Sequence, residues 1–494
     1  MTNIKYFAGI AAAQAQQPEP GALSPFDFDS MITRGWFARL KEAAALRALD
    51  FAYPFSRRFR PLLSLGGIVH VTRAEQVREV LARSDDFRVP FGPEMAELGD
   101  GPIFLLGLDG PPHDRMLGVL RHFVKREDAA RMAEWSLSFA DALLDNSAGR
   151  IDVVADLIKR VPAEICLRYF GLSCDEIDAF ADWTIALSAL LFGDPTGKPE
   201  IRSLAMNAKQ RLGLVLAEAL AQTQRNHRRG LIDPARADTL VERLVLIQAQ
   251  EGLTDAEVRA ILMGMVTGFI PTNTLAASNM LTVLLKRPAA MAMAQEAARN
   301  DDRDMMRRIV LEAGRLSPAL SPGQWRHAPH DTSLTVDGRV HQIKAGTTLL
   351  VSTMSALRDP REVNDPKAFR IDRTNSDGSL QDSDLVFGGG PHVCIGKHLA
   401  IEQISALFTA LLRRDTLAVA PGKAGKLSSI GPFPRHREMT WQTPASEQSM
   451  FLVIAPLREG VAKADTDKCL AELGNPAGAK IRAALDATGI VHFT

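Results

Sequence analysis

Short apolar runs alternate with polar ones at the start of the main part of the chain. In "GGIVHVTRAEQVREVLARS", the residues from Ile68 to Val71 form a continuous apolar run typical of a strand. A polar break follows, and Val77, Val80 and Leu81 then recur at helical spacing. The stretch therefore predicts one short strand followed by an amphipathic helix.

The longest apolar stretch lies near the middle of the chain and predicts a single helix. Thr254 and Glu257 have the spacing of a capping box, which marks where this helix begins. The apolar pattern continues to Pro288, so the helix is expected to cross the whole core. Pro271 lies inside it, although proline lacks an amide hydrogen and costs about 3 kcal/mol in a helix interior.

Period-two patterning appears between residues 320 and 350. The segment "WRHAPHDTSLTVDGRVHQIKAGTTLLVSTM" alternates apolar and polar residues, and Asp337 and Gly338 form a strong hairpin-turn signal within it. Most other segments have helical spacing. The predicted fold class is therefore mainly α with small β-sheets.

Changes in composition divide the chain. Residues 1–25, rich in Ala, Gln and Pro, are expected to be a disordered leader, and residues 26–443 carry the main helical pattern. Residues 449–494 contain the run "MFLVIAPL", a helical stretch and "GIVHFT", which predict a short C-terminal β-α-β extension. This tail either packs on the main body or is part of a truncated ferredoxin-like α/β unit, and we favour the second interpretation.

Composition and charge exclude several classes of protein. Hydrophobic residues make up 46% of the 494 residues, enough for a sizeable core. Lys plus Arg and Asp plus Glu both number 58, so no net charge indicates nucleic acid or an anionic membrane. The four cysteines are too few for a disulfide scaffold. We expect a cytoplasmic protein with no membrane span and no nucleic-acid partner.

Candidate chemistry lies in the glycine-rich segment "FGGGPHVCIGKHLA". Its glycines allow backbone amides to approach the sulfur of Cys394, and a helix is predicted directly after it. Amide donors and a helix N-terminus both favour a thiolate, which is the form that an axial iron ligand requires. One alternative is a nucleotide-binding loop, which fails because no strand and Gly-x-Gly-x-x-Gly register fit. The other is an ordinary turn with a buried cysteine.

This segment resembles the heme-binding loop of the cytochrome P-450 family at every fixed position of its Phe-Gly-x-Gly-x-His-x-Cys-x-Gly pattern. Three more stretches are similar to family motifs in the right order. "LDGPPHDRMLGVLRHFV" matches the start of the C helix, "LEAGRLSP" the Glu-x-x-Arg motif, and "SALRDPREVNDPKAFRIDR" the meander. The resemblance covers roughly residues 50 to 440 and implies a mainly helical, single-domain heme-thiolate fold.

The resemblance implies a cofactor and its ligand. Cys394 would bind the iron of heme b (iron protoporphyrin IX) as a thiolate, within a loop that also includes Phe387, Gly388 and Gly396. Glu312 and Arg315 would be structural and would hold the meander behind the heme, although on their own they would be interpreted as a surface i,i+3 pair.

The resemblance also implies contacts to the heme propionates. His113, Arg326 and His392 match positions that usually supply cations to these carboxylates. One departure is Leu117, because the family often has a basic residue four positions after the C-helix histidine.

Pro271 falls where the family's central helix usually reads Ala/Gly-Gly-x-Asp/Glu-Thr. With Gly268 as the second glycine, the acid–alcohol pair becomes Ile270–Pro271, and in the register shifted by one it becomes Pro271–Thr272. The acid that would deliver protons to dioxygen is missing in either register. Pro271 would still free a carbonyl one turn earlier and distort the helix.

The candidate catalytic residues are Pro271, Thr272, Asn273 and Thr274. The three polar ones would bond an oxygen species, or each would simply bond its own helix turn. A peroxide or hydroperoxide already contains an O–O bond and would make proton delivery to dioxygen unnecessary.

The sequence thus predicts a heme-thiolate oxidoreductase acting on an apolar small molecule, such as a fatty acid, an oxylipin or a terpenoid. Either oxygen insertion or peroxide and hydroperoxide O–O bond chemistry would be its reaction. One alternative is a fatty-acid hydroperoxide isomerase, dehydratase or peroxygenase. The other is a non-catalytic heme-binding sensor or partner subunit.

Partners depend on the oxidant. With dioxygen, electrons must come from a separate ferredoxin and reductase, since the chain has no flavin or iron–sulfur motif. Docking near the cysteine loop would use four basic residues, or these form an ordinary solvated face: Arg121, Lys125, Arg126 and Lys397. The pocket walls implied by the resemblance are Phe91, Leu190, Leu191, Phe192, Phe269, Ile270, Leu320 and Phe433. Apolar residues on such helices are more often plain core.

Overall fold

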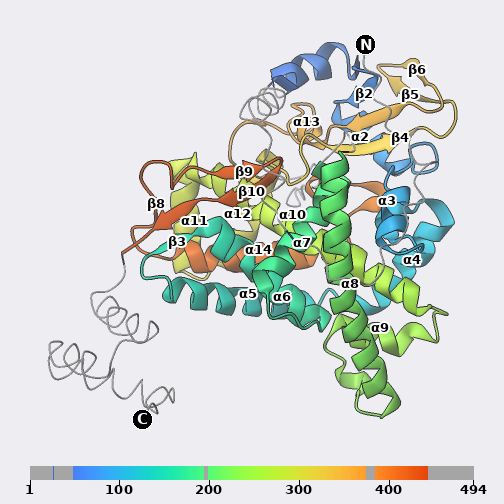
Figure 1. Cartoon of the computed structure of the whole chain (residues 1–494). Helices are drawn as coiled ribbons and strands as arrows, with labels where there is room; N and C mark the ends of the chain where they lie inside the picture. The colour runs from blue at the N-terminus through green and yellow to red at the C-terminus, as the bar shows by residue number, and fades with distance from the viewer. Residues whose placement is uncertain (1–25, 27–47, 50, 194–197, 374–383, 443–494) are drawn as a thin grey trace, which may run out of the picture.

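The computed structural model describes residues 26, 48–49, 51–193, 198–373 and 384–442. In these ranges a body of helices carries four small sheets (Figure 1). The fold class is mainly α, as the sequence predicts. The expected leader and the expected β-α-β extension lie outside the described residues.

The largest sheet joins segments that are far apart in the sequence. β1 (Leu62–Leu65) and β2 (Ile68–Val71) form an antiparallel hairpin, and β2 coincides with the predicted strand. β2 also pairs in parallel with β7 (Thr348–Val351), and β7 pairs antiparallel with β4 (Gln324–His327). The order is therefore β1-β2-β7-β4, which brings the N-terminal region against the segment just after residue 320.

Three smaller sheets complete the strands. They are β5 (Thr332–Val336) with β6 (Arg339–Ile343), β9 (Ser428–Ile430) with β10 (Phe433–His436), and β3 (Arg150–Asp152) with β11 (Glu438–Thr440) and β8 (Ala418–Val419). The β5–β6 hairpin turns at Asp337 and Gly338, both at positive φ, as the turn signal predicts.

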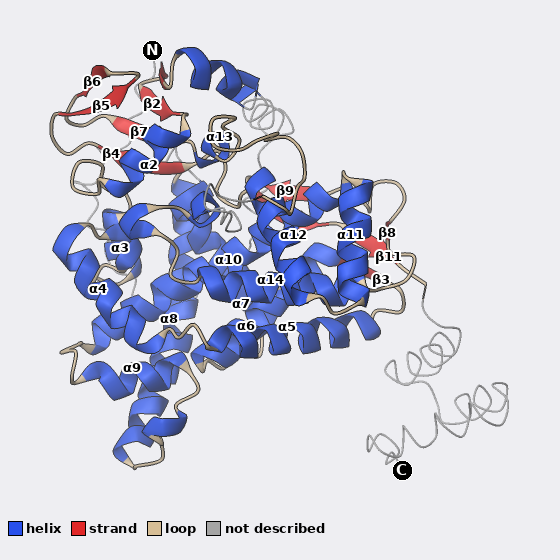
Figure 2. Ribbon diagram, turned by 180° about the vertical axis from the view of Figure 1, so that it is seen from behind, coloured by secondary structure: helices blue, strands red, loops and turns tan. Residues whose placement is uncertain are grey.

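Helices make up most of the remainder (Figure 2). In chain order, the α-helices are α2 (Ala74–Ala82), α3 (Gly92–Leu98), α4 (Gly110–Phe123), α5 (Asp128–Asp145), α6 (Arg160–Phe170), α7 (Ile177–Ser188), α8 (Pro199–Arg228), α9 (Leu240–Gln248), α10 (Asp255–Leu285), α11 (Pro288–Arg299), α12 (Arg303–Leu316), α13 (Thr353–Ala356) and α14 (Lys397–Leu412). Short 3₁₀ or π segments are η3 (Leu105–Gly107), η4 (Val153–Ile158), η5 (Ala189–Gly193), η6 (Pro234–Arg236), η7 (Asp384–Phe387) and η8 (Gly390–His392).

α10 runs through the middle of the helical body (Figure 1). Its predicted capping box is present: the Thr254 hydroxyl accepts from the Glu257 amide at 3.2 Å, and the Glu257 carboxylate accepts from the Thr254 amide at 2.8 Å. α6, α7, α8 and α12 all pack against α10. By length and composition α10 could cross a membrane, but 72% of its most apolar window is buried inside the protein, as expected of a core helix.

Candidate active site

The cysteine loop lies between η7 and α14 and depends on glycine at two positions. Gly388 and Gly390 both have positive φ, at 87° and 63°. A Cβ on Gly390 would lie 2.0 Å from the Leu81 carbonyl oxygen, so a larger residue there would displace the loop from α2. The amide of Cys394 donates to the Phe387 carbonyl at 3.0 Å, which closes the loop.

Cys394 carries the sulfur that would bind iron, and its surroundings set the pKa of the thiol. Its side chain is solvent-exposed in the protein, yet the surrounding protein atoms raise the pKa of the thiol by desolvation, against the Gly396 amide, which lowers it. A sulfur that faces a cavity, and not bulk water, accounts for both the accessible side chain and the raised pKa. Burial thus outweighs the stabilisation of the thiolate that the Gly396 amide provides. A bound metal ion deprotonates a coordinating thiol outright.

The three residues predicted to contact the heme propionates come together from separate elements. His113 of α4 and His392 of η8 have ring centroids 4.4 Å apart, and Arg326 of β4 is close enough to lower the pKa of His392, which burial lowers most. Asp109, which precedes α4, bonds His392 Nε2 through Oδ1 at 3.0 Å and the Val89 amide through Oδ2 at 3.1 Å. Sequence reasoning missed Asp109, which holds His392 in place.

The cluster of His113, His392 and Arg326 contains buried polar groups suited to bind an anion. Arg326 is only 2% exposed, and among the described residues no carboxylate lies within ion-pair distance of it. Burial lowers the pKa of Arg326 to about 10, although Asp109 opposes this shift. His113 is 1% exposed, and its Nε2 has no hydrogen-bond partner in the described part of the chain. Arg326 donates to its own strand, to the Trp325 carbonyl at 2.8 Å and to Gln324 at 3.4 Å, so its charge and not its hydrogen bonding lacks a partner. Buried polar groups normally have partners, and the propionates of a heme fit the unpaired nitrogen of His113 and the charge of Arg326.

Glu312 and Arg315 form a buried pair that supports the segment before the cysteine loop. Arg315 donates to both Glu312 oxygens, at 2.7 and 2.8 Å. It also donates to the carbonyls of Leu357, Pro366 and Ala368, at 2.9, 2.9 and 3.1 Å. Glu312 in turn accepts from the Arg370 amide at 2.9 Å and from Arg373 at 3.3 Å. The pair thus holds residues 357–373, the meander-like stretch, against α12.

One stripe of α10 stays partly accessible although most of the helix is buried. The accessible positions in its central part are Met265, Gly268, Phe269, Thr272, Ala276 and Asn279. Their spacing of three and four residues places them on one face of the helix. A Cβ added at Gly268 would meet no atom within 4 Å, so open space lies over this stripe.

The polar candidates of α10 differ in position. Thr272 lies on the accessible stripe, and its hydroxyl donates to the Gly268 carbonyl. Asn273 and Thr274 are buried and donate to the carbonyls of Phe269 and Ile270, each at 2.8 Å. All three side chains thus bond their own helix.

Helical geometry also corrects two candidates. Ile270 and Thr274 lie on the face opposite the stripe and are fully or almost fully buried. We therefore leave Ile270 out of the substrate pocket and Thr274 out of the oxygen site. α10 continues as a helix through Pro271, so any distortion at this proline does not interrupt it.

Aromatic contacts connect several predicted wall residues. The rings of Phe91 and Phe192 meet edge to face with centroids 5.5 Å apart, and Phe269 meets Phe170 of α6 in the same way at 5.7 Å. Leu190 and Leu320 are half-buried, and Leu191 and Phe433 are buried. Phe91 and Phe192 thus join the segment before α3 to η5.

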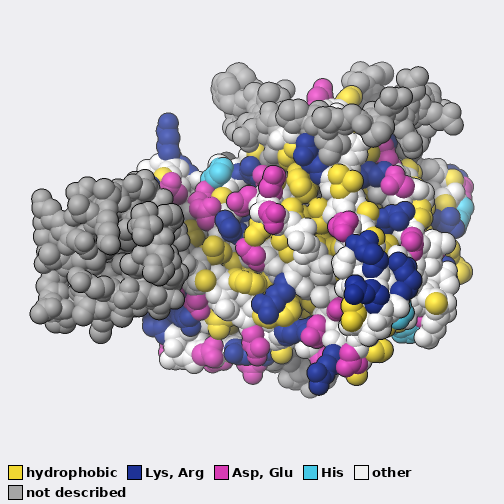
Figure 3. Space-filling model, turned by 60° about the horizontal axis from the view of Figure 1, so that its bottom comes forward, with side chains coloured by type: hydrophobic (Ala, Val, Ile, Leu, Met, Phe, Trp, Pro, Cys, Tyr) yellow, Lys and Arg dark blue, Asp and Glu magenta, His cyan; other side chains and the backbone are white. Residues whose placement is uncertain are grey.

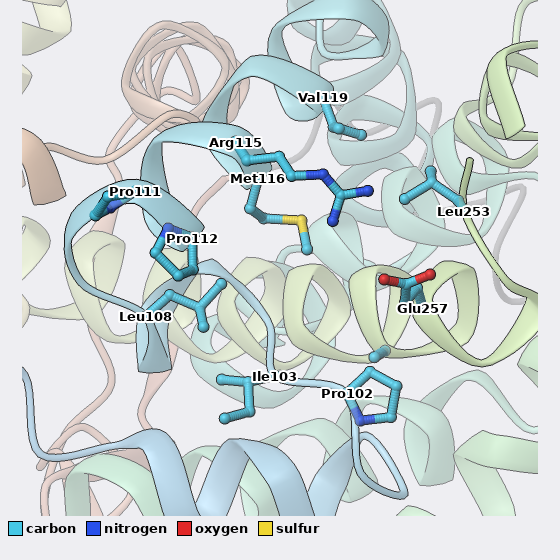
Figure 4. Close-up of a pocket in the computed structure, with 11 residues that line it drawn as sticks. Pro102, Ile103, Leu108, Pro111, Pro112, Arg115, Met116, Val119, Leu253 and Glu257 are labelled. Carbon is cyan, nitrogen blue, oxygen red and sulfur yellow. The ribbon is translucent and has the colours of Figure 1, made fainter. Parts of the chain in front are cut away.

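A cavity of about 460 Å³ lies elsewhere, between α4 and the start of α10 (Figure 4). Its lining comes from residues 102–119 and 253–260 and includes three prolines. Arg115 and Glu257 reach toward each other across it. Because its lining includes neither the cysteine loop nor the α10 stripe, we do not place the substrate there.

A second cavity, of about 530 Å³, adjoins the cysteine loop and is strongly basic. Arg126 and Lys397, two of the four expected docking residues, line it, whereas Arg121 and Lys125 are exposed without lining it. Four further arginines line this cavity and were not predicted as docking residues, two from α12 and two from the meander-like stretch: Arg307, Arg308, Arg370 and Arg373. Figure 3 shows one face of the molecule, on which acidic and basic side chains are interspersed and several basic ones gather in one place.

Comparisons with known proteins agree with this arrangement. A family model described as "Cytochrome P450" matches residues 69–437. Nocardicin C N-oxygenase of Nocardia uniformis subsp. tsuyamanensis is 25% identical over 388 residues, covering 75% of this chain and 89% of that protein. Vitamin D3 dihydroxylase of Streptomyces griseolus is 27% identical over 365 residues, covering 71% and 81%. The solved structure of the open cytochrome P-450 EryK from S. erythraea has a TM-score of 0.66 at 23% identity, covering 81% and 98%.

The mainly helical fold with its cysteine loop is that of the heme-thiolate proteins. The chain belongs to the cytochrome P-450 family. It is therefore an oxidoreductase of the monooxygenase type, and the sensor interpretation is set aside.

Proposed function

We propose that this cytochrome P-450 binds heme through Cys394 and oxidises an apolar small molecule held over the α10 stripe. The observation that carries the proposal is the buried cluster of His113 and Arg326, which has polar groups suited to two propionates. With a thiolate ligand, heme supplies activation of dioxygen or of a peroxide for transfer of one oxygen atom.

The side chains around the stripe support an apolar substrate. Met265, Phe269 and Ala276 present apolar surface, and the contact between the Phe91 and Phe192 rings attaches η5 to the segment before α3. Such a space binds by removing apolar area from water, with few polar groups to orient the ligand. A fatty acid, an oxylipin or a terpenoid fits this chemistry. The names of the relatives include a nocardicin and vitamin D3, so they assign no single substrate.

The α10 stripe supplies one alcohol for proton handling. Thr272 is the hydroxyl that faces the open space, and its proton is committed to the Gly268 carbonyl, which leaves its oxygen lone pairs available to accept. In this arrangement Thr272 accepts a hydrogen bond from an oxygen species or a water, and water completes the path to solvent.

Pro271 favours a second candidate function, the use of a peroxide or hydroperoxide as the oxygen source. The place of the family's acid is taken by Ile270 or by Pro271, depending on the register, and neither side chain can transfer a proton. The stripe itself carries no carboxylate at its six accessible positions. A peroxide brings its own O–O bond and two electrons, so it needs no external reductant. This candidate includes isomerisation or dehydration of fatty-acid hydroperoxides.

The basic cavity beside the cysteine loop is the proposed docking site for an acidic ferredoxin when dioxygen is used. Most of its arginines are already paired, Arg307 with Glu402 and Arg373 with Glu312. Arg126 has no ion pair among the described residues and is exposed, so it is free to meet a partner's carboxylate.

A comparison of two oxidant systems tests the proposed function. The purified holoenzyme is mixed with a fatty-acid hydroperoxide in the absence of any reductase, and separately with a fatty acid, ferredoxin, reductase and NADPH. Product only in the second mixture makes the protein a dioxygen-dependent monooxygenase. Rapid loss of the conjugated-diene absorbance in the first, with a defined product and intact heme, establishes hydroperoxide chemistry. No product in either mixture contradicts the fatty-acid substrate class.

A further inference from the structure

Pro271 changes the hydrogen bonding of α10 at one carbonyl. The residue at position 271 of a helix normally donates its amide hydrogen to the carbonyl of Thr267, four residues earlier. Proline has no such hydrogen. Thr267 is 1% exposed, so water cannot take the place of the missing donor. A donor from another element is therefore needed at this point.

Ser188 meets this need. Its hydroxyl, fully buried at the last residue of α7, donates to the Thr267 carbonyl at 3.2 Å. Several other buried or half-buried hydroxyls on helices of this chain donate to carbonyls of their own helix, as is usual for Ser and Thr, and four serve as examples. These are Ser136 to Met132, Thr184 to Ala181, Thr223 to Ala219 and Thr409 to Ser405. Ser188 differs because its bond crosses from one helix to another.

The position of Ser188 gives this bond a consequence for the pocket. η5 begins at the next residue and carries Leu190 and Phe192, and the Phe192 ring rests edge to face on Phe91. A bond at the end of α7 thus fixes where this apolar wall begins relative to α10, the helix that carries Thr272.

We propose that Ser188 is a positioning residue whose bond to the Thr267 carbonyl, required by Pro271, holds the η5 wall against α10 and slows ligand escape. The inference rests on the proposed function in one respect, that the η5 wall borders the substrate pocket. It is independent of the oxidant. Pro271 then has a structural role of its own: it provides the acceptor through which α7 is attached to α10.

The test uses phenylimidazole, an apolar azole that coordinates heme iron, and follows its dissociation from the holoenzyme by stopped-flow absorbance of the Soret band. Ser188→Ala is expected to speed dissociation about tenfold, the equivalent of one lost buried hydrogen bond. Ser188→Thr keeps a hydroxyl that can donate, so its dissociation rate is expected to stay close to that of the wild type. Thr184→Ala, on the same helix but bonded within it, is the matched control and is expected to leave the rate unchanged.

A second background separates this role from general stability. Pro271→Ala supplies the missing amide hydrogen, so the Thr267 carbonyl no longer depends on Ser188. In that background Ser188→Ala is expected to change the dissociation rate by less than about twofold. An equal effect in both backgrounds overturns the link to Pro271. A lower melting temperature with an unchanged dissociation rate shows that Ser188 is merely structural and overturns the positioning role.

Failure of the proposed function gives a different result. If phenylimidazole does not shift the Soret band of the wild-type holoenzyme, no apolar ligand reaches the heme, and the pocket assignment is wrong, together with the inference that depends on it. If the wild type binds phenylimidazole and Ser188→Ala releases it at the wild-type rate, the inference alone is wrong.

Discussion

Replacing Arg315 by alanine probes the support behind the cysteine loop. The variant leaves Glu312 as a buried carboxylate without its bidentate partner. It also leaves the Leu357 and Pro366 carbonyls without this donor, whereas the Ala368 carbonyl still accepts from Arg373 at 3.0 Å. Breaking a buried ion pair from one side costs about 3–5 kcal/mol, and each buried carbonyl left unpaired adds about 1–3 kcal/mol. Arg370 and Arg373 still bond Glu312 and offset part of this loss.

The expected loss is thus at least about 4 kcal/mol, against a total stability of about 5–15 kcal/mol for a typical protein. Urea unfolding of the holoenzyme, followed by tryptophan fluorescence, measures it as a lower midpoint. Arg315→Lys keeps the charge, but lysine lacks the planar fork of donors that bonds Glu312 and the carbonyls together. An intermediate loss is therefore expected.

Arg307→Ala is the matched control. Arg307 lies on the same helix and pairs with the carboxylates of Glu402 and Asp304, but its side chain is 37% exposed. Ion pairs of this kind contribute about 0–1 kcal/mol. If Arg315→Ala loses no more stability than Arg307→Ala, the reasoning about the buried pair is refuted.

Three further variants test the site and the pH response. Thr272→Ala is expected to lower product formation with ferredoxin, reductase and NADPH on the order of 100-fold while leaving peroxide-supported turnover unchanged; equal losses in the two assays would argue against a role in proton handling. Arg326→Leu is expected to speed heme transfer to apomyoglobin about 10-fold or more, since hydrogen bonds to charged groups contribute about 1.5–3 kcal/mol, without lowering the stability of the apoprotein; a wild-type rate of heme loss would count against the propionate contact. Burial lowers the pKa of His70 below 6.5, so the unfolded chain takes up this proton first as the pH falls. Stability is therefore expected to decline below about pH 6.5, and His70→Gln should decline less on the same urea curves; identical declines would contradict this.

Much of the fold follows from local signals in the sequence. The capping box at Thr254 and the hairpin turn at Asp337 each depend on a few neighbouring residues, and both are found where expected. The bland interpretation of Glu312 and Arg315 as a surface pair is wrong, because the structure places both inside the protein and surrounds them with carbonyls. Spacing along one helix does not reveal this burial.

Contacts between segments that are far apart in the chain could not be predicted from the sequence. Asp109 bonds His392 across a separation of 283 residues, and only the fold brings them together. The bond from Ser188 to Thr267 could be predicted only in part. Pro271 predicts a carbonyl without its helical donor, but the sequence does not show which side chain donates to it. Ile270 and Thr274 were misjudged because the register of a helix against its neighbours decides which face is open.

The central claim is that Cys394 binds heme iron as a thiolate. The carbon monoxide difference spectrum of the reduced protein tests it most directly, with Cys394→Ser as the comparison. If Cys394 is the ligand, the wild type shows the strongly red-shifted Soret band of a thiolate-ligated heme, and the variant does not. An unshifted band in the wild type, or a red-shifted band that persists in Cys394→Ser, would contradict it.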